Sequence, residues 1–147
     1  MSSLTSMWIH GTIVQAENQP YYLQIIRRGW GTHFVGAVGN WYHIPITTPV
    51  LLYDNRPTLQ KLFVFYKATL AKITAVHIYD GNSRVKEFNG LNLTGDHTNG
   101  IDASNSWDIN PKITIGYGLG ISVHVETEDA MGMEVLFTTA GADFETM

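Results

Sequence analysis

The chain has 147 residues, a mass of 16.4 kDa and a net charge of −4, and 44% of its residues are hydrophobic. This length fits a single domain over 1–147, and the composition is typical of a globular protein rather than a disordered one. The negative charge, without a large cluster of Lys and Arg, argues against nucleic acid as a partner.

Targeting and redox features are equally plain. The absence of cysteine excludes disulfides and thiolate metal sites. The N-terminal segment lacks the basic stretch and apolar core of a secretion signal. No apolar run is long enough to span a bilayer, so no membrane partner is expected. We therefore expect a cytoplasmic protein.

Strand patterns follow one another along the chain, and no window favours an amphipathic helix. We predict strands over 8–14, 21–28, 32–38, 40–46, 61–69, 72–80, 84–89, 112–119, 121–128 and 133–140.

Three of these segments carry further information. The strands over 61–69 and 72–80 are joined by Leu70 and Ala71 and are predicted to form a hairpin. The short, charged strand over 84–89 is typical of a sheet edge. In 121–126, Ile, Val and Val alternate with Ser, His and Glu, which indicates an antiparallel strand with one buried face.

The number and spacing of the strands predict the fold class. Nine or ten short strands separated by Gly, Pro and Asn turns indicate an all-β protein. We expect a single antiparallel β-sandwich, of the jelly-roll or immunoglobulin-like kind, with a small closed β-barrel as the alternative.

Histidine is abundant, yet its spacing does not predict a metal site. The six histidines each lie in a different segment, and none forms the H-x-H pair that would place two imidazoles on one face of a strand. A metal site would require them to converge through the fold, so we predict neither a metal nor a cofactor.

The segment 91–109 is the most polar part of the chain. It spaces Asp96, Asn99, Asp102, Asn105 and Asp108 three residues apart, whereas a helix-loop-helix calcium loop places its acids at alternate residues. Because Asp, Asn, Ser and Gly stabilise turns with their own side chains, we interpret the segment as a long connection built by turn chemistry.

Four short runs form a familiar set: H-x-P-I-x-T-P from His43, V-H-x-Y-D-G around His77, G-D-H at Asp96 and His97, and G-L-G-I-S-V. Together they resemble a family of small, functionally uncharacterised microbial proteins over about residues 39–125. The resemblance implies no activity, but it favours His43, His77, Asp96 and His97 over the other histidines as candidate catalytic groups.

The aromatic content of 12% favours ligand recognition. Rings beside Asn, Asp and Arg are the chemistry of sugar or small-molecule binding, and they also mark interfaces. We select Trp30, Trp41, Trp107 and Asp102 as candidate ligand contacts. The leading hypothesis is therefore a non-catalytic protein that binds a small molecule or glycan, or assembles as a homo-oligomer.

The alternative hypothesis is an enzyme of the isomerase, cyclase or lyase type. Such chemistry needs only a shaped pocket and one or two acid–base groups, with His43, His77 or His97 beside a carboxylate and with or without a His-bound metal. No serine lies in a G-x-S-x-G motif, so hydrolysis is not predicted.

Overall fold

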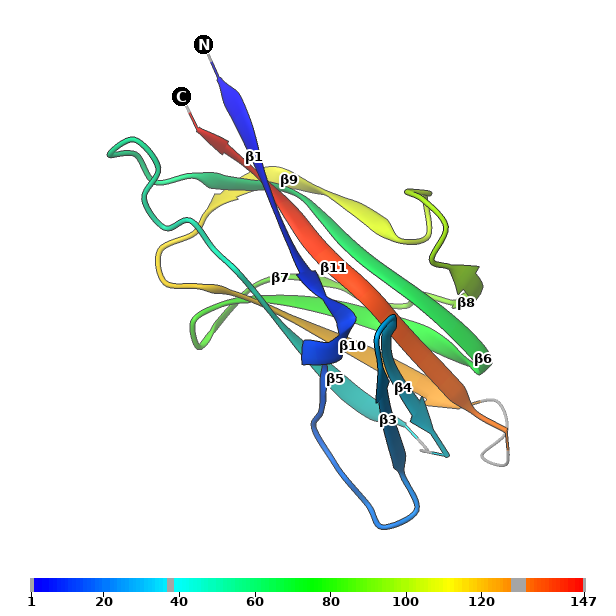
Figure 1. Cartoon of the computed structure of the whole chain (residues 1–147). Helices are drawn as coiled ribbons and strands as arrows, with labels where there is room; N and C mark the ends of the chain where they lie inside the picture. The colour runs from blue at the N-terminus through cyan, green and yellow to red at the C-terminus, as the bar shows by residue number, and fades with distance from the viewer. Residues whose placement is uncertain (1, 37–38, 128–131, 147) are drawn as a thin grey trace.

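The computed structural model describes residues 2–36, 39–127 and 132–146, and in these ranges the chain is almost entirely antiparallel strand (Figure 1). The described part contains one short 3-10 turn, η1, and no helix that could cross a membrane. The elements are β1 (Ser3–His10), η1 (Gly11–Ile13), β2 (Gln15–Ala16), β3 (Gln24–Arg28), β4 (Gly31–Val35), β5 (Asn40–Ile46), β6 (Thr58–Asp80), β7 (Ser83–Phe88), β8 (Leu93–His97), β9 (Ser106–Thr114), β10 (Leu119–Thr127) and β11 (Glu134–Thr146).

The long strand β6 organises the fold. Up to Thr69 it pairs with β11, and from Ala71 onward it pairs with β10. Leu70, between these parts, has a φ of 50°, and the strand bends sharply there, so its two parts run in different directions (Figure 1). The two parts do not pair with each other anywhere in 58–80, so the predicted hairpin is wrong. One edge of β6 is occupied by β10 and β11, and the other by β7, β8 and β9.

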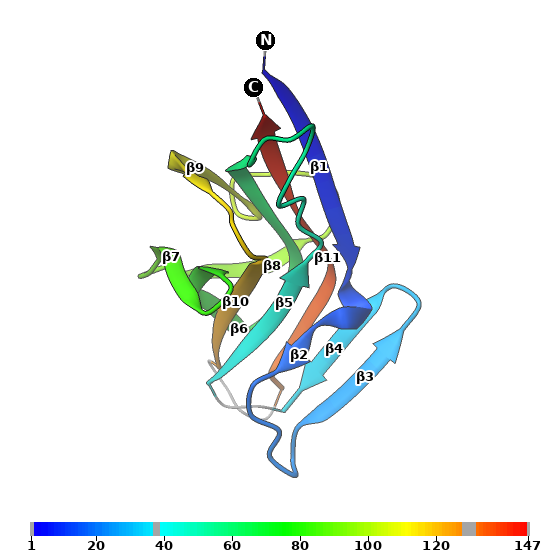
Figure 2. The same cartoon turned by 90° about the vertical axis from the view of Figure 1, so that its left-hand side faces the viewer.

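The bend divides the sheet into two facing layers (Figures 1 and 2). The first layer contains β1, β11, the N-terminal part of β6 and β9, with β4 and β3 beside them. The second contains β2, β5, β10, the C-terminal part of β6 and β7. The prediction of an all-β antiparallel sandwich is confirmed. The strand path ends at β2 and β3, which do not pair in the described residues, so the sheet does not close as the alternative barrel would.

The core fills the space between the layers. Alternate residues of each strand point inward, and the rings of Phe34, Tyr42 and Phe137 meet across the gap, with centroids 4.5 Å apart for Phe34 and Tyr42 and 5.5 Å apart for Tyr42 and Phe137. All three rings are fully buried. Burying such large rings supplies much of the hydrophobic stabilisation. The other residues of each strand are left on the outer faces.

The first predicted strand, over 8–14, is interrupted. The chain leaves β1 at His10, forms η1 and enters β2 at Gln15. A Cβ at Gly11 would lie 2.0 Å from the carbonyl oxygen of Phe137, so only glycine permits this contact with β11. The predicted strands over 32–38 and 121–128 extend into 37–38 and 128, which lie outside the described residues.

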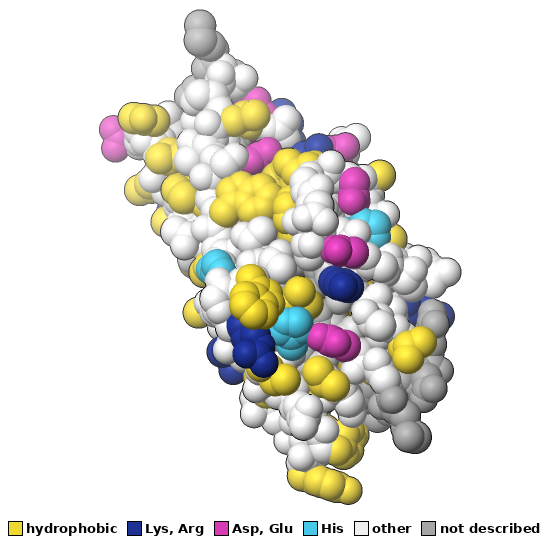
Figure 3. Space-filling view, turned by 45° about the vertical axis from the view of Figure 1, so that its right-hand side comes forward, with side chains coloured by type: hydrophobic (Ala, Val, Ile, Leu, Met, Phe, Trp, Pro, Cys, Tyr) yellow, Lys and Arg dark blue, Asp and Glu magenta, His cyan; other side chains and the backbone are white. Residues whose placement is uncertain are grey.

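The outer face of the first layer carries aromatic side chains (Figure 3). Trp8 on β1 stacks on Phe63 of β6, with ring centroids 4.8 Å apart and planes 24° apart. The ring lies over Gly141 of β11, where a Cβ would be only 2.3 Å from it. The sequence therefore leaves a flat space on β11 into which Trp8 fits.

Candidate functional site

The outer face of the second layer carries a row of polar side chains held in register by three strands. Ser122 on β10 pairs with His43 on β5 at one side and with His77 on β6 at the other. Two residues further along β10, His124 lies beside Trp41 of β5. Because directly paired residues project to the same side of a sheet, these five side chains share one surface.

A hollow of about 240 Å³ lies over this row. An adjoining hollow of about 350 Å³ shares several of its residues and extends over a more apolar surface. We call the two together the histidine groove. Its lining residues are Gln15, Glu17, Trp41, His43, Ile44, Pro45, His77, Tyr79, Arg84, Gly120, Ile121 and Ser122.

His43 connects a hydroxyl to a carboxylate across the groove. Its Nδ1 lies 2.8 Å from Ser122 Oγ, and its Nε2 lies 3.0 Å from Glu17 Oε1. A carboxylate only accepts, so Nε2 carries the hydrogen and donates to Glu17. In the neutral ring Nδ1 is then an acceptor, and the Ser122 hydroxyl donates to it. The ring orientation and tautomer are thereby fixed.

The other two histidines of the face are also held. His77 Nε2 donates to Asn89 Oδ1 at 2.8 Å, and His124 Nδ1 lies 2.7 Å from Thr74 Oγ1. The Trp41 ring lies between them, 4.8 Å from each imidazole centroid. These contacts leave few free rotamers, so the groove has a preorganised wall. Among the described residues, no group of three His, Asp or Glu could hold a metal ion.

Of the candidate catalytic residues, the structure brings His43 and His77 together and places Asp96 and His97 elsewhere. Asp96 and His97 end β8, which pairs with the N-terminal part of β6. They therefore do not face His43 and His77 across a pocket. Trp41 is the candidate ligand contact that joins His43 and His77 in the histidine groove.

His97 holds the loop between β8 and β9. Its Nδ1 contacts Asp102 Oδ2 at 2.9 Å, and its Nε2 contacts the carbonyl oxygen of Thr94 at 2.8 Å. Both partners only accept, so both ring nitrogens donate and the ring is an imidazolium. Partial burial works against the charge, but the bond to Asp102 and that to Thr94 outweigh it and raise the pKa of His97. The hydrogen bond from His97 lowers the pKa of Asp102 in turn.

Turn chemistry holds residues 98–105, as predicted, but the segment 91–109 is not one long connection, because 93–97 forms β8 and 106–109 belongs to β9. The Asn105 side chain donates to the carbonyl oxygens of His97 and Gly100 and accepts from the amide of Asp102. Asp96 accepts from both the amide and the hydroxyl of Thr98, which is a local Asx-type turn. Each of these bonds lies within the loop, and Asp102 is one of its supports.

The remaining two tryptophan candidates lie apart from each other. Trp30 is in the turn between β3 and β4, on the first layer, and is 58% exposed. Trp107 is only 9% exposed, because β9 places it opposite Leu62 and its ring packs near Phe88. Trp107 is therefore a core residue and offers no open face to a ligand.

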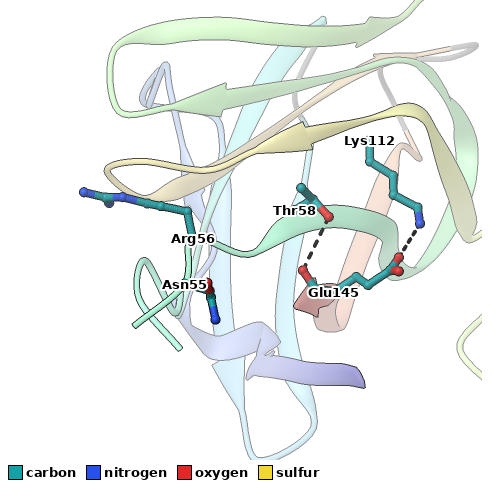
Figure 4. A pocket seen from close by; sticks show the side chains of 5 residues that line it. All are labelled: Asn55, Arg56, Thr58, Lys112 and Glu145. Atoms are coloured by element: carbon teal, nitrogen blue, oxygen red, sulfur yellow. Dashed lines mark hydrogen bonds and ion pairs between the residues drawn. The ribbon is translucent and has the colours of Figure 1, made fainter. Parts of the chain in front are cut away.

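Another hollow, of about 350 Å³, lies near the end of β11 (Figure 4). Its charged side chains are already paired or point away. Lys112 forms an ion pair with Glu145, and Arg56 donates to the carbonyl oxygen of Gly116 at 3.0 Å. These groups satisfy one another and tie strand ends together, so the hollow has less to offer a ligand than the histidine groove.

A comparison with protein families assigns the chain to one of them. Residues 2–146 match the model of a family of unknown function, DUF6623. The chain belongs to this family. A search of curated proteins found no match.

Two solved structures show a general likeness. One, a carbohydrate-binding module CBM36 in complex with calcium and xylotriose, is 14% identical over 90% of this chain and 96% of that one, with a TM-score of 0.48. The other is the CBM36-1 domain of a multidomain xylanase from the hindgut metagenome of Trinervitermes trinervoides. It is 12% identical over 94% and 96% of the two chains, and its TM-score is also 0.48. At these values neither likeness carries information about the ligand of this chain.

Of the residues that line the groove, sequence reasoning selected only Trp41, His43 and His77. Glu17, Tyr79, Arg84 and Ser122 are among those it missed. Ser122 was predicted to face outward, but the bond to His43 joins residues 79 positions apart. Glu17 follows a strand of only two residues. A single sequence carries no signal for such long-range pairs, because strand partners are not encoded locally.

Proposed function

We propose that the histidine groove binds a small, neutral, polar ring compound, and that a glycan is the class it fits best. The observation that supports this most strongly is the placing of two aromatic rings, Trp41 and Tyr79, beside hydrogen-bonding groups that are already held in position. Sugars present an apolar face and a polar rim, so they match a ring beside donors and acceptors.

The two ends of the groove suit the two parts of such a ligand. The polar end has Glu17, Arg84 and Ser122, which can accept from and donate to hydroxyl groups. The apolar end has Pro45 and Gly120 in one cross-strand row with Tyr79, so the Tyr79 ring lies beside an open, side-chain-free position on β10. A ring stacked over Gly120 would lie against Tyr79.

Binding is favoured over nucleophilic catalysis by the position of Ser122. It is only 7% exposed and lies in mid-strand, with β5 on one side and β6 on the other. The backbone amides on either side are committed to the ladder, so they are not available to stabilise an oxyanion beside Ser122.

The test is titration with neutral mono- and oligosaccharides, followed by calorimetry and by amide shifts in NMR spectra. We expect saturable binding with shifts confined to β5, β10 and the C-terminal part of β6. Tyr79→Ala and His43→Gln should each weaken binding about tenfold or more, the loss of one good contact. Trp30→Phe, on the opposite layer, is the matched control and should bind as the wild type does. Shifts confined to the first layer, or full binding by both groove variants, would refute the proposal.

A second candidate function follows from the Ser122–His43–Glu17 chain, which has the order of a nucleophile, base and orienting acid. In an acyl transfer, Ser122 Oγ would bond to the acyl carbon while its proton passes to His43 Nδ1. His43 would then give that proton to the departing alcohol. Reaction with a fluorophosphonate, read by intact mass, separates this function from binding. Labelling of the wild type and not of Ser122→Ala would support it, and no labelling of either would exclude it.

A further inference from the structure

A further hollow, of about 280 Å³, lies on the outer face of the first layer, away from the histidine groove. It is bounded by the turn between β3 and β4, by β11 and by the N-terminal part of β6. Figure 3 shows this face, where a histidine lies among hydrophobic, basic and acidic side chains. We call the hollow the Trp30 pocket, lined by Trp30, His33, Lys67, Thr69, Glu134 and Leu136.

Trp30 is exposed yet held. Its indole Nε1 donates to His33 Nε2 at 3.1 Å, with the two rings perpendicular. Nε2 is therefore the acceptor, so His33 carries its hydrogen on Nδ1 and donates it to Glu134 Oε1 at 2.5 Å. This chain of bonds fixes a large apolar ring at the surface, where it would otherwise sample several rotamers. Because the ring is already held, the protein loses less conformational entropy when a ligand stacks on it.

Two charged side chains line the pocket, the basic Lys67 and the acidic Glu134. Glu134 keeps its negative charge, although its Oε1 accepts a hydrogen bond from His33, whereas Lys67 forms no ion pair among the described residues. Asp96 lies opposite Lys67 on β8 and is attracted to it, although its Oδ1 accepts from the amide and hydroxyl of Thr98. Arg28 adds a further positive charge, with its guanidinium 5.7 Å from the centroid of the Trp30 ring.

We propose that the Trp30 pocket binds a small ring-bearing carboxylate. The ring would stack on Trp30 and against Leu136, and the carboxylate would pair with Lys67 and accept from the Thr69 hydroxyl. A volume of about 280 Å³ lies at the lower end of the range for ligand sites, so the ligand has one or two rings. Both an aromatic acid and a sugar acid have this chemistry.

The experiment follows the Trp30 indole N–H resonance in ¹⁵N NMR spectra, assigned with Trp30→Phe. The probes are benzoate and glucuronate, with benzyl alcohol and glucose as their neutral counterparts. We expect a saturable shift with at least one acid, at a dissociation constant below about 1 mM, and at least tenfold weaker binding of its neutral counterpart. A response to benzoate alone assigns an aromatic acid, and a response to glucuronate alone assigns a sugar acid.

Matched variants test the role of the charge. Lys67→Met should weaken binding about tenfold or more, because it removes one ion pair in a partly desolvated pocket. The Trp30 resonance again reports the binding. Lys72→Met removes the same charge from the other part of β6 and should bind within about twofold of the wild type. The proposal is overturned if neither acid gives saturation by about 10 mM, if the neutral compounds bind equally well, or if Lys67→Met binds as tightly as the wild type.

Discussion

Asp80 offers a sharp test of how the end of β6 supports the groove. Its carboxylate accepts three backbone amides from the loop between β9 and β10: Gly116 to Oδ2 at 2.9 Å, and Tyr117 and Gly118 to Oδ1 at 2.8 and 3.1 Å. The loop leads directly into β10, which carries Ser122. Asp80→Ala removes all three acceptors at once.

The expected loss follows from these bonds. A net contribution of about 1 kcal/mol for each, kept at the lower end because water can reach this partly exposed loop, gives about 3 kcal/mol for Asp80→Ala. Asp80→Asn keeps one acceptor oxygen but turns an amide toward the Gly116 N–H, so it should lose about 1–2 kcal/mol.

The shifted pKa of Asp80 also predicts how the stability of the fold changes with pH. Partial burial tends to raise the pKa of Asp80, but the three amides and the nearby Arg56 outweigh it and lower that pKa. A carboxyl with a lowered folded-state pKa stabilises the fold fully above its unfolded value, about 3.9, and the contribution is lost as the pH falls through the folded value. The difference between wild type and Asp80→Asn should therefore shrink below about pH 4.

Urea unfolding at pH 7 and at pH 3 measures both effects. Asp108→Asn is the control, since Asp108 is an exposed carboxylate 3.8 Å from Lys61, and it should change stability by less than about 0.5 kcal/mol. The reasoning fails if Asp80→Ala also stays within about 0.5 kcal/mol of the wild type, or if its loss is the same at both pH values.

Three further outcomes are expected. Gly141→Ala places a Cβ 2.3 Å from the Trp8 ring and should lower the free energy of unfolding by about 1–3 kcal/mol. Gly29→Ala is the control, because the space around Gly29 is open and its stability should not change. Equal urea midpoints for the two variants would contradict this. His97→Gln should lower the free energy of unfolding more at pH 5.5 than at pH 9. The raised folded-state pKa of His97 means that its protonation stabilises the fold fully below the unfolded value of about 6.5, and this contribution is lost as the pH rises through the folded value. A loss that does not depend on pH would count against the imidazolium. One edge of β1 has no partner strand among the described residues, and Leu4 is exposed there. If this edge mediates self-association, light scattering should show a mass above 16.4 kDa that falls in Leu4→Lys, and a monomeric wild type would exclude it.

The local features of the fold could be predicted because they depend on neighbouring residues. The alternation in 121–126 correctly placed Ile121 and Val123 in the core and Ser122 on the opposite face of β10, although neighbouring side chains leave Ser122 only 7% exposed there. The charge of 84–89 correctly indicated an edge strand, since within the described part of the chain β7 pairs only with β6. Turn chemistry is confirmed for residues 98–105, where Asp, Asn and Ser bond to nearby backbone, but the strands β8 and β9 at either side were not predicted.

The failures concern contacts made at a distance. Leu70 and Ala71 were read as a hairpin connection, but a bend with a positive φ at a non-glycine residue leaves no sequence signal. Polar neighbours suggested an exposed Trp107, yet pairing with β6 turns it into the core. His43 and His77 line the same groove only because β10 lies between their strands, and the order of the strands depends on the whole chain.

The bend at Leu70 has a consequence for how the molecule gains and loses its structure. Both layers contain part of β6, so neither layer is complete without it. Its N-terminal part pairs with almost the full length of β11, and the pair Thr58–Glu145 joins residues far apart in the sequence. Contacts so distant along the chain are costly in loop entropy, which predicts slow folding for a chain of this length. The same sharing makes separate melting of one layer unfavourable, since it would strip partners from the other. The two outer faces, with their different pockets, should therefore persist or disappear together as one cooperative unit.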